Sequence, residues 1–238
     1  SLLQRRNEAS KEIGQIKAKG GDAVVLMVKV AAMKILSAEL EEKEATLAES
    51  LNQHLSALPN MLDDDTPNGK SEEDNVEVRK VGDPRKLNSE APDHVAIGES
   101  LGMMDFDTAA KMSGSRFVLM HSGLARLERA LAQFMLDTHT MEHGYTEVSP
   151  PLMVRDQAMY GTGQLPKFAE DQFKTTRGDW LIPTAEVPLT NIVADMIIED
   201  GSFPRRYTAF TPCFRQEAGA AGTDTRGMIR PHQFYEVP

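Results

Sequence analysis

The sequence predicts an α+β protein in which a long helical hairpin precedes a globular domain of antiparallel strands and flanking helices. Apolar residues recur every three, four or seven positions between Leu2 and Leu58, which is typical of helices that pack along one face. Runs rich in β-formers and aromatics at residues 206–216 and 229–237 flank a stretch of Gly, Ala, Asp and Thr. Such a pattern indicates a strand, a long loop and a second strand.

Composition limits the class of protein. A chain of 238 residues with 40% hydrophobic content can hold one sizeable domain and an appendage. No apolar run approaches twenty residues, so we expect no membrane segment or signal peptide and a cytoplasmic location. The single cysteine, Cys213, excludes an internal disulfide and a Cys-rich zinc site, and we predict no bound metal site in the protein itself. A net charge of −10 requires any RNA contact to come from a locally basic surface.

The first 58 residues are predicted to form an antiparallel coiled-coil arm. Residues 2–19 carry a sparse apolar stripe, and Gly20 and Gly21 break the helical pattern. A longer helix follows from Ala23 to Leu58. Its predicted apolar seam consists of Val25, Val28, Ala32, Leu36, Leu40, Leu47, Leu51, Leu55 and Leu58.

Charge is uneven along this arm. Residues 1–34 carry seven Lys or Arg against three Asp or Glu, whereas residues 35–54 carry one Lys against five Glu. The candidate phosphate-binding residues are Arg5, Arg6, Lys11, Lys17, Lys19 and Lys29. From the sequence alone, a merely solvated helix face is an equally good interpretation of this charge.

The helical period stops at Pro59, and residues 59–92 are predicted to be a linker that leads to a globular domain, residues 93–238. In that domain we expect a helix within 93–115, a short strand at 116–119 and an amphipathic helix at 123–140. Residues 145–154 then form an extended run with two prolines, which favours an edge strand.

Residues 157–171 are predicted to form a loop, followed by a short apolar run from Trp180 to Thr190. On extended backbone Thr184 and Glu186 would share a face. A hydroxyl and a carboxylate placed there can hold the ammonium and small polar side chain of an amino acid. The alternative is a solvent-facing polar pair before a helix at 191–199.

The strand, loop and strand near the C-terminal end carry the densest chemistry. Alternation places Cys213, Arg215 and Glu217 on one face, and Arg230, His232 and Phe234 on one face of the return strand. If the two faces coincide, they form a surface suited to a flat base with phosphates. An Arg-x-Glu pair taken alone is more often a solvated charge pair.

The run from Thr211 to Phe234 closely resembles the second signature motif of class II aminoacyl-tRNA synthetases, in the form found in seryl-tRNA synthetases. The resemblance rests on Phe-Arg-x-Glu at 214–217 and Arg-x-His-Gln-Phe at 230–234. The helix, strand and Pro151 at 123–154 resemble motif 1, which builds the dimer interface in that class. Thr-x-Glu at 184–186 resembles the serine-binding element, and the arm resembles the tRNA-binding arm of the family.

The resemblance implies an enzyme that joins L-serine to serine tRNA through seryl-adenylate, using ATP and Mg²⁺, as a homodimer whose arm grips the tRNA elbow and long variable arm. It implies a catalytic role for Arg215 and serine binding by Thr184, Glu186 and Arg215. The ATP-binding residues that it implies are Arg215, Gln216, Glu217, Arg230, His232, Gln233 and Phe234. Among these, it implies that Phe234 stacks on adenine and Arg230 helps to hold the phosphates.

Two departures from the family pattern stand out. The third motif of the class is missing from the 238 residues, and Pro238 occupies the position of a family glutamate that contacts serine. We expect the chain to be part of a longer protein, so this fragment alone need not be active. Two alternatives remain, a related ligase that charges a carrier protein and an inactive dimeric coiled-coil scaffold. The arm counts against the first, and the polar site face counts against the second.

Overall fold

The computed structural model describes residues 2–86, 91–217 and 226–238. The chain divides into two compact units, Ser1–Lys70 and Ser71–Pro238, and the division falls within the predicted linker, residues 59–92. Helices dominate the first unit, while helices and short strands alternate in the second. The predicted α+β class is therefore confirmed. No helix in the described part of the chain is long and apolar enough to cross a membrane.

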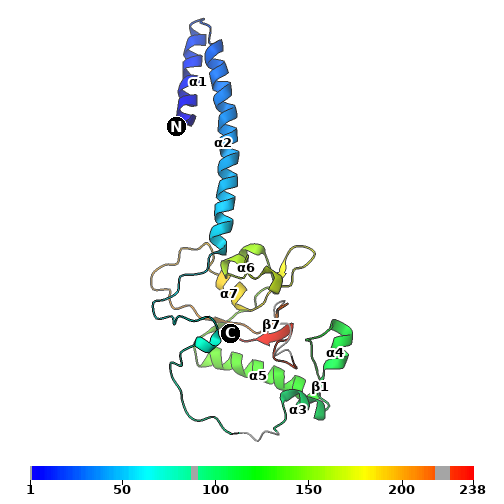
Figure 1. The fold of residues 1–238 in the computed structure, drawn as a ribbon. Helices are drawn as coiled ribbons and strands as arrows, with labels where there is room; N and C mark the ends of the chain where they lie inside the picture. The colour runs from blue at the N-terminus through cyan, green and yellow to red at the C-terminus, as the bar shows by residue number, and fades with distance from the viewer. Residues whose placement is uncertain (1, 87–90, 218–225) are drawn as a thin grey trace. The chain divides into compact units, whose positions relative to one another are not determined.

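The first unit is the predicted helical hairpin. Helix α1 spans Leu2–Ala18 and α2 spans Val24–Ala57, and the two run antiparallel (Figure 1). Gly20 makes the turn with a φ of 73°, a value that glycine adopts without strain. The Asp22 carboxylate then accepts a hydrogen bond from the Val24 amide at 2.9 Å, which helps to start α2.

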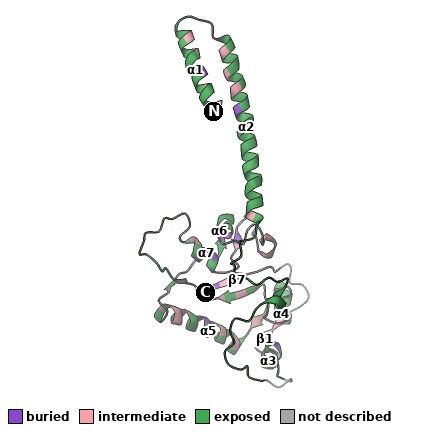
Figure 2. Cartoon of the chain, turned by 60° about the vertical axis from the view of Figure 1, so that its left-hand side comes forward, coloured by how far each residue is buried: buried purple, intermediate pink, exposed green. Residues whose placement is uncertain are grey.

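The apolar seam of α2 differs from the predicted one. Val25 and Val28 are 72% and 64% exposed, whereas Leu26, Val30 and Met33 are half-buried against α1. Apolar residues fill most positions between 23 and 33, so their spacing alone does not decide which face turns inward. Beyond Ser37 the surface of α2 is almost entirely exposed (Figure 2).

The second unit begins with short elements. These are η1 Glu72–Asp74, α3 His94–Ser100, β1 Met104–Asp105, α4 Phe106–Ser113, β2 Leu119–Met120 and α5 Ser122–Met141. The predicted helix within 93–115 is thus two helices separated by β1. Asp93 and Asp105 each accept a backbone hydrogen bond at the start of a helix, and these bonds lower the pKa of both carboxyl groups. The strand predicted at 116–119 starts only at Leu119, since Arg116 has a φ of 66°.

The remaining elements are β3 Thr146–Glu147, β4 Met153–Val154, α6 Asp156–Gly161, η2 Ala169–Asp171, β5 Trp180–Leu181, α7 Glu186–Asn191, β6 Tyr207–Thr208, β7 Thr211–Phe214 and β8 Gln233–Glu236. Pairs β1–β2, β4–β5 and β7–β8 are antiparallel, and β3–β6 is parallel. Among the described residues each ladder has two strands. The Phe214 amide donates to the Ile182 carbonyl at 2.9 Å and so ties the end of β7 to the chain beyond β5.

Two predictions for this half are wrong in detail. The predicted loop at 157–171 contains most of α6 and all of η2. The predicted helix at 191–199 is absent, because α7 ends at Asn191 and Asp195 has a φ of 57°. Most of the long loop predicted between the last two strands, residues 218–225, lies outside the described residues.

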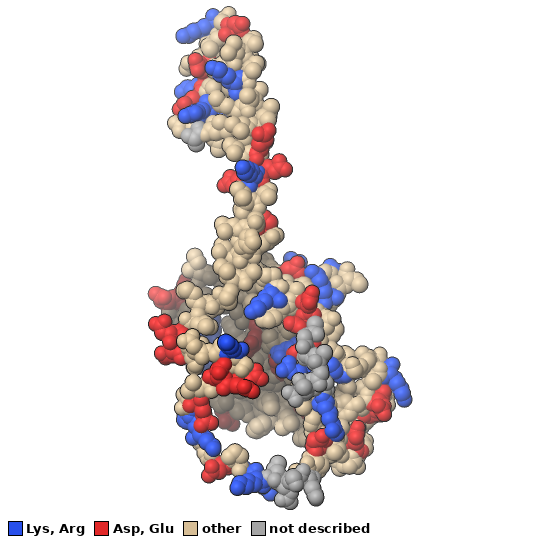
Figure 3. Space-filling model, viewed as in Figure 1, with Lys and Arg blue, Asp and Glu red and all other residues tan. Residues whose placement is uncertain are grey.

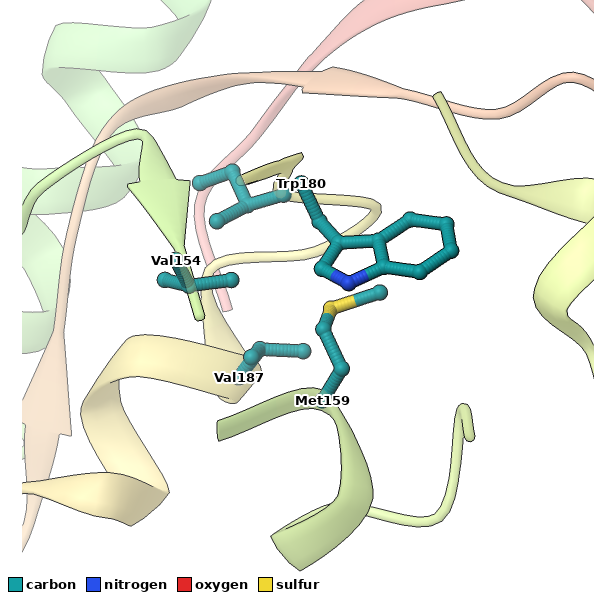
Figure 4. Packing of buried hydrophobic residues seen from close by; sticks show 5 residues of the cluster. Val154, Met159, Trp180 and Val187 are labelled. Carbon is teal, nitrogen blue, oxygen red and sulfur yellow. The ribbon is translucent and has the colours of Figure 1, made fainter. Parts of the chain in front are cut away.

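The main core cluster packs α6 and α7 against β4 and β5 (Figure 4). Its buried members are Val154, Met159, Trp180, Ile182 and Val187. Met159, Ile182 and Val187 are fully buried. A second cluster joins Ala185 and Leu189 to Ala209. Because α7 and the residue before it contribute to both clusters, the backbone at 182–189 is held from two sides.

Candidate functional site

Strands β7 and β8 bring the predicted site residues together. Cys213 lies opposite Phe234, and the Arg215 amide donates to the His232 carbonyl at 3.0 Å. Directly opposed residues of an antiparallel pair share a face. Arg215, His232 and Phe234 therefore lie on one face, as predicted. Glu236, opposite Thr211, continues the same face.

Arg215 is held on several sides. Its Nε donates to the Pro183 carbonyl at 3.1 Å, and its Nη2 lies 3.3 Å from Glu236 Oε1. The guanidinium carbon sits 4.9 Å from the centre of the Phe234 ring, within the range of a cation–π contact. Its side chain is 40% exposed. Arg215 is thus an anchored cation with an open side.

Glu236 is the residue that sequence reasoning missed. Its Oε2 accepts from the Thr184 hydroxyl at 2.6 Å and lies 3.3 Å from the Ala185 amide, while its Oε1 faces Arg215. The alternation that placed Phe234 on the site face also reaches position 236, so the signal was present in the sequence.

Glu217 does not share a strand face with Arg215, contrary to the prediction. Strand β7 ends at Phe214, and Glu217 has a φ of 49°. Its carboxylate instead meets Arg230 at 3.2 Å. Arg116 holds this region from outside the predicted set, since its Nε donates to the Arg230 carbonyl at 2.8 Å. No local motif marks Arg116 in the sequence.

Thr184 and Glu186 do not lie on extended backbone. Ala185 is helical, with φ −64° and ψ −22°, and Glu186 is the first residue of α7. Because the chain turns into a helix here, the two side chains line different cavities. The apolar residues that follow Thr184 are Val187, Pro188 and Leu189, and all three are buried by α7. This turn therefore separates the two residues that were predicted to act together.

In the described part of the chain, three cavities are lined by predicted site residues. One of about 230 Å³ is lined by Gln164, Phe168, Asp171, Gln172, Pro183, Thr184, Arg215 and Glu217. Glu186 lines a second, of about 390 Å³, together with Tyr145, Arg205 and Pro238. Gln233 and Phe234 line a third, also about 390 Å³. The predicted ligand residues thus divide between these cavities, except Gln216, Arg230 and His232, which line none of the three.

Some of the predicted site residues support the backbone around the site. His232 Nδ1 lies 2.9 Å from the Arg215 carbonyl, and its ring packs near Phe117 and Phe173. Gln216 has an exposed side chain, while its amide donates to the Asp171 carbonyl at 2.8 Å. The Pro238 carbonyl accepts from the Thr208 hydroxyl at 2.6 Å.

The lone cysteine is buried on the site face, as predicted. Burial raises the pKa of the Cys213 thiol to about 12, and the nearby Glu236 carboxylate adds to the shift. The thiol therefore stays protonated at neutral pH and can donate weakly to Glu236 Oε2, 3.5 Å away. Cys213 fills space and supports Glu236, and it is not activated as a nucleophile.

In the described residues, no group of three or more His, Cys, Asp or Glu side chains is placed to hold a metal ion. His139 and His143 are four residues apart, a spacing that the sequence prediction did not take into account. Their Nδ1 atoms are 3.0 Å apart, which a hydrogen bond from one ring to the other explains.

The predicted tRNA-binding residues all lie on the helical hairpin, where blue Lys and Arg side chains gather at its upper part (Figure 3). Arg6 is half-buried, and Arg5, Lys11, Lys17, Lys19 and Lys29 are exposed. Pro151 is exposed just before β4.

Comparisons with known proteins agree with this arrangement. Residues 1–62 match a family model described as the seryl-tRNA synthetase N-terminal domain, and residues 172–237 match the tRNA synthetase class II core domain (G, H, P, S and T). The chain is 58% identical over 236 residues to serine–tRNA ligases of Paramagnetospirillum magneticum and Brucella canis. It covers 56% and 55% of their lengths, so it spans about half the length of the curated relatives it matches.

Solved structures add the three-dimensional comparison. Seryl-tRNA synthetase from Pyrococcus horikoshii, complexed with ATP, aligns with a TM-score of 0.84 and 36% identity, over 99% of this chain and 57% of that one. A cytoplasmic serine–tRNA ligase of Naegleria fowleri in complex with AMP aligns with a TM-score of 0.74 and 24% identity, which supports the fold. With the arm, the class II core and the sequence comparison in agreement, the chain is similar over nearly its whole length to the seryl-tRNA synthetases, a family of class II aminoacyl-tRNA synthetases.

Proposed function

We propose that the protein containing this chain joins L-serine to serine tRNA in two steps. The serine carboxylate first attacks the α-phosphate of ATP to give seryl-adenylate and pyrophosphate, and the seryl group then passes to a hydroxyl of the terminal ribose of the tRNA with release of AMP. The observation that carries the proposal is the anchored Arg215 beside Thr184 on one cavity. Such chemistry depends mainly on positioning and charge neutralisation, which a fixed guanidinium supplies.

Within this proposal, Arg215 binds the α-phosphate and the serine carboxylate, and Phe234 stacks on adenine. Thr184 holds the serine end of the substrate, and Arg230 contacts the phosphates once it leaves Glu217. Glu186 approaches serine only from the neighbouring cavity, so its direct role requires the ligand to extend there. Gln216, Glu217, His232 and Gln233 complete the proposed ATP site, with His232 acting through the Arg215 backbone.

We propose that Mg²⁺ accompanies ATP. Mg²⁺ keeps several waters and is usually bound by one or two carboxylates together with substrate phosphates, so a dedicated protein cage is not required. The oxygen donors Asp171 and Glu217 line the Arg215 cavity and fit that requirement. When bound, the ion would neutralise phosphate charge alongside Arg215.

The test of the overall function is ATP–pyrophosphate exchange by the complete gene product. We expect exchange that depends on L-serine and is absent with L-alanine or L-threonine. Exchange without serine dependence would contradict the assignment. The proposed activity uses serine tRNA and ATP, both met in the cytoplasm, so we also propose a cytoplasmic location.

The arm is proposed to bind serine tRNA through its basic segment, residues 1–34. Replacing Arg5, Arg6, Lys11, Lys17, Lys19 and Lys29 with Gln should weaken binding of a serine tRNA transcript. The salt dependence should flatten, because each lost phosphate contact removes roughly 0.7–0.9 from the slope of log K against log salt. Filter binding at several salt concentrations measures both effects.

A matched control removes six exposed positive charges outside the arm, by replacing Lys70, Arg79, Lys80, Arg85, Lys86 and Lys111 with Gln. This control should keep both affinity and slope close to the unmodified values. Serine-dependent exchange should be unaffected by either set. Equal losses of tRNA affinity in the two sets would mean that the effect arises from net charge and not from the arm. No loss of affinity in the first set would reject the arm as the tRNA-binding element.

Homodimerisation through α5 and the segment around Pro151 is also proposed. Several large apolar side chains of α5 are exposed, among them Leu127, Leu131 and Phe134 at 51%, 47% and 67%. An apolar helix face of this kind is typical of a subunit interface. Sedimentation of the complete gene product tests the proposal, and a monomer at micromolar concentration would contradict it.

A further inference from the structure

We propose that Glu236 is a positioning residue, which couples Thr184 to Arg215 and fixes the direction in which each presents its binding groups. The expected effect on ATP–pyrophosphate exchange rests on the proposed function, whereas the expected change in the position of Arg215 does not. No motif in the sequence singles out this carboxylate, and it lies at the centre of the contacts on the site face.

The two oxygens of Glu236 have separate tasks. Oε2 accepts from the Thr184 hydroxyl at 2.6 Å, and the Ala185 amide and Cys213 thiol lie at 3.3 and 3.5 Å from the same atom. Oε1 reaches Arg215 Nη2 at 3.3 Å. The carboxylate is 26% exposed, and two further donors besides Thr184 hold its inner oxygen. The carboxylate is therefore held in place, and it can orient the side chains of Thr184 and Arg215.

For Arg215, this contact fixes the guanidinium in its plane. Nε and Nη2 form one edge of the guanidinium group. Nε donates to the Pro183 carbonyl, and Nη2 donates to Glu236 Oε1. The Phe234 ring lies against the guanidinium. Arg215 also lines the 230 Å³ cavity, where we infer that its remaining donors meet the ligand. A donor that is already oriented loses little freedom when an anion binds, which is what a rate-enhancing cation requires.

For Thr184, the contact fixes the role of the hydroxyl. Its proton is committed to Glu236 Oε2, and the Glu186 amide donates to the hydroxyl oxygen at 3.4 Å, so the one remaining lone pair can serve a ligand only as an acceptor. An acceptor favours a ligand that brings an N–H or O–H group, such as an ammonium or an alcohol. Glu236 thus orients Thr184 to accept a hydrogen bond from the ligand and orients Arg215 to bind an anion.

The test compares Glu236→Gln with the unmodified complete gene product. A glutamine replaces one of the two carboxylate oxygens with an NH2 group, which only donates, so it cannot accept at both the Thr184 and the Arg215 position. We expect kcat of ATP–pyrophosphate exchange to fall by about 10- to 100-fold, with KM for ATP changing less than about threefold. Adding Thr184→Val should cost little more in the Glu236→Gln background than one of the two changes alone, because the pair acts as a unit.

Glu147→Gln serves as the matched control, since Glu147 is an exposed strand carboxylate outside the network, and it should leave exchange unchanged. A crystal structure of Glu236→Gln gives a readout independent of activity. We expect the Arg215 guanidinium to leave the Pro183 carbonyl or to occupy several rotamers. If Arg215 keeps its contact, or if exchange rises because Glu236 merely competes with the substrate anion, the positioning role is overturned. Absence of exchange in the unmodified protein would instead reject the proposed function.

Discussion

Arg215→Ala is expected to lower serine-dependent ATP–pyrophosphate exchange by about 10²- to 10³-fold, the usual loss when one preorganised charge-stabilising donor is removed. Arg215 is fixed by the Pro183 carbonyl, Glu236 and the Phe234 ring, so its guanidinium has little freedom left to lose when an anion binds. In the proposed reaction, the negative charge on the α-phosphate region grows in the transition state. The loss should therefore appear mainly in kcat, measured with the complete gene product.

Arg215→Lys should restore little of the activity. A lysine ammonium is a point charge and cannot contact Pro183, Glu236 and a phosphate with the planar fork of arginine. Arg177→Ala is the matched control, because Arg177 is 84% exposed and contacts only Asp179 among the ion pairs of the described residues. Thermal melts establish that each variant is folded. Exchange within about tenfold of the unmodified rate, roughly 1.4 kcal/mol, would make Arg215 a structural residue.

Met159→Ala is expected to lower the free energy of unfolding of the second unit by about 2–5 kcal/mol, the range for deleting a buried methionine or leucine side chain. Met159 is fully buried, and its sulfur end lies beside the Trp180 ring (Figure 4). The substitution leaves a cavity between α6 and β5. Urea unfolding followed by fluorescence reports directly on this cluster, since Trp180 is the only tryptophan in the chain.

Met196→Ala removes the same side chain from a position that is 56% exposed, and it should change the stability by less than about 0.5 kcal/mol. A similar loss in both variants would mean that the cost arises from methionine itself and not from burial. An unchanged stability in Met159→Ala would show that the core collapses to fill the space. Either result would contradict the packing described for this cluster.

Local chemistry explains why parts of the fold could be predicted. The glycine pair at 20–21 marks the hairpin turn, and the apolar stripe of residues 123–140 predicts α5, Ser122–Met141, almost to its ends. The strand pair that ends beside Arg215 and carries Phe234 follows from two runs rich in β-formers and aromatics, although the strand predicted at 206–216 is divided into β6 and β7. In each case the signal lies within a few neighbouring residues, so no tertiary contact is needed to recognise it.

Other features depend on contacts between distant segments. The inward face of α2 is chosen by packing against α1, because its own sequence is apolar all round near Val24. The turn of the chain into α7 at Ala185 separates Thr184 from Glu186 and is set by two core clusters. Glu217 leaves the strand face through a positive φ, beside a backbone that Arg116 holds from 101 residues away in the chain.

Three consecutive residues tie the site to the core. The Ile182 side chain is fully buried and its carbonyl accepts from Phe214, the Pro183 carbonyl accepts from Arg215, and the Thr184 hydroxyl donates to Glu236. Opening this peptide segment would expose the Phe214 amide to solvent and release the ligand-facing groups together. Hydrogen exchange at Phe214 should therefore proceed at the rate of global opening, and heat inactivation should follow the same event. Arg215 and Thr184 are therefore expected to lose their positions together with the core packing around Ile182.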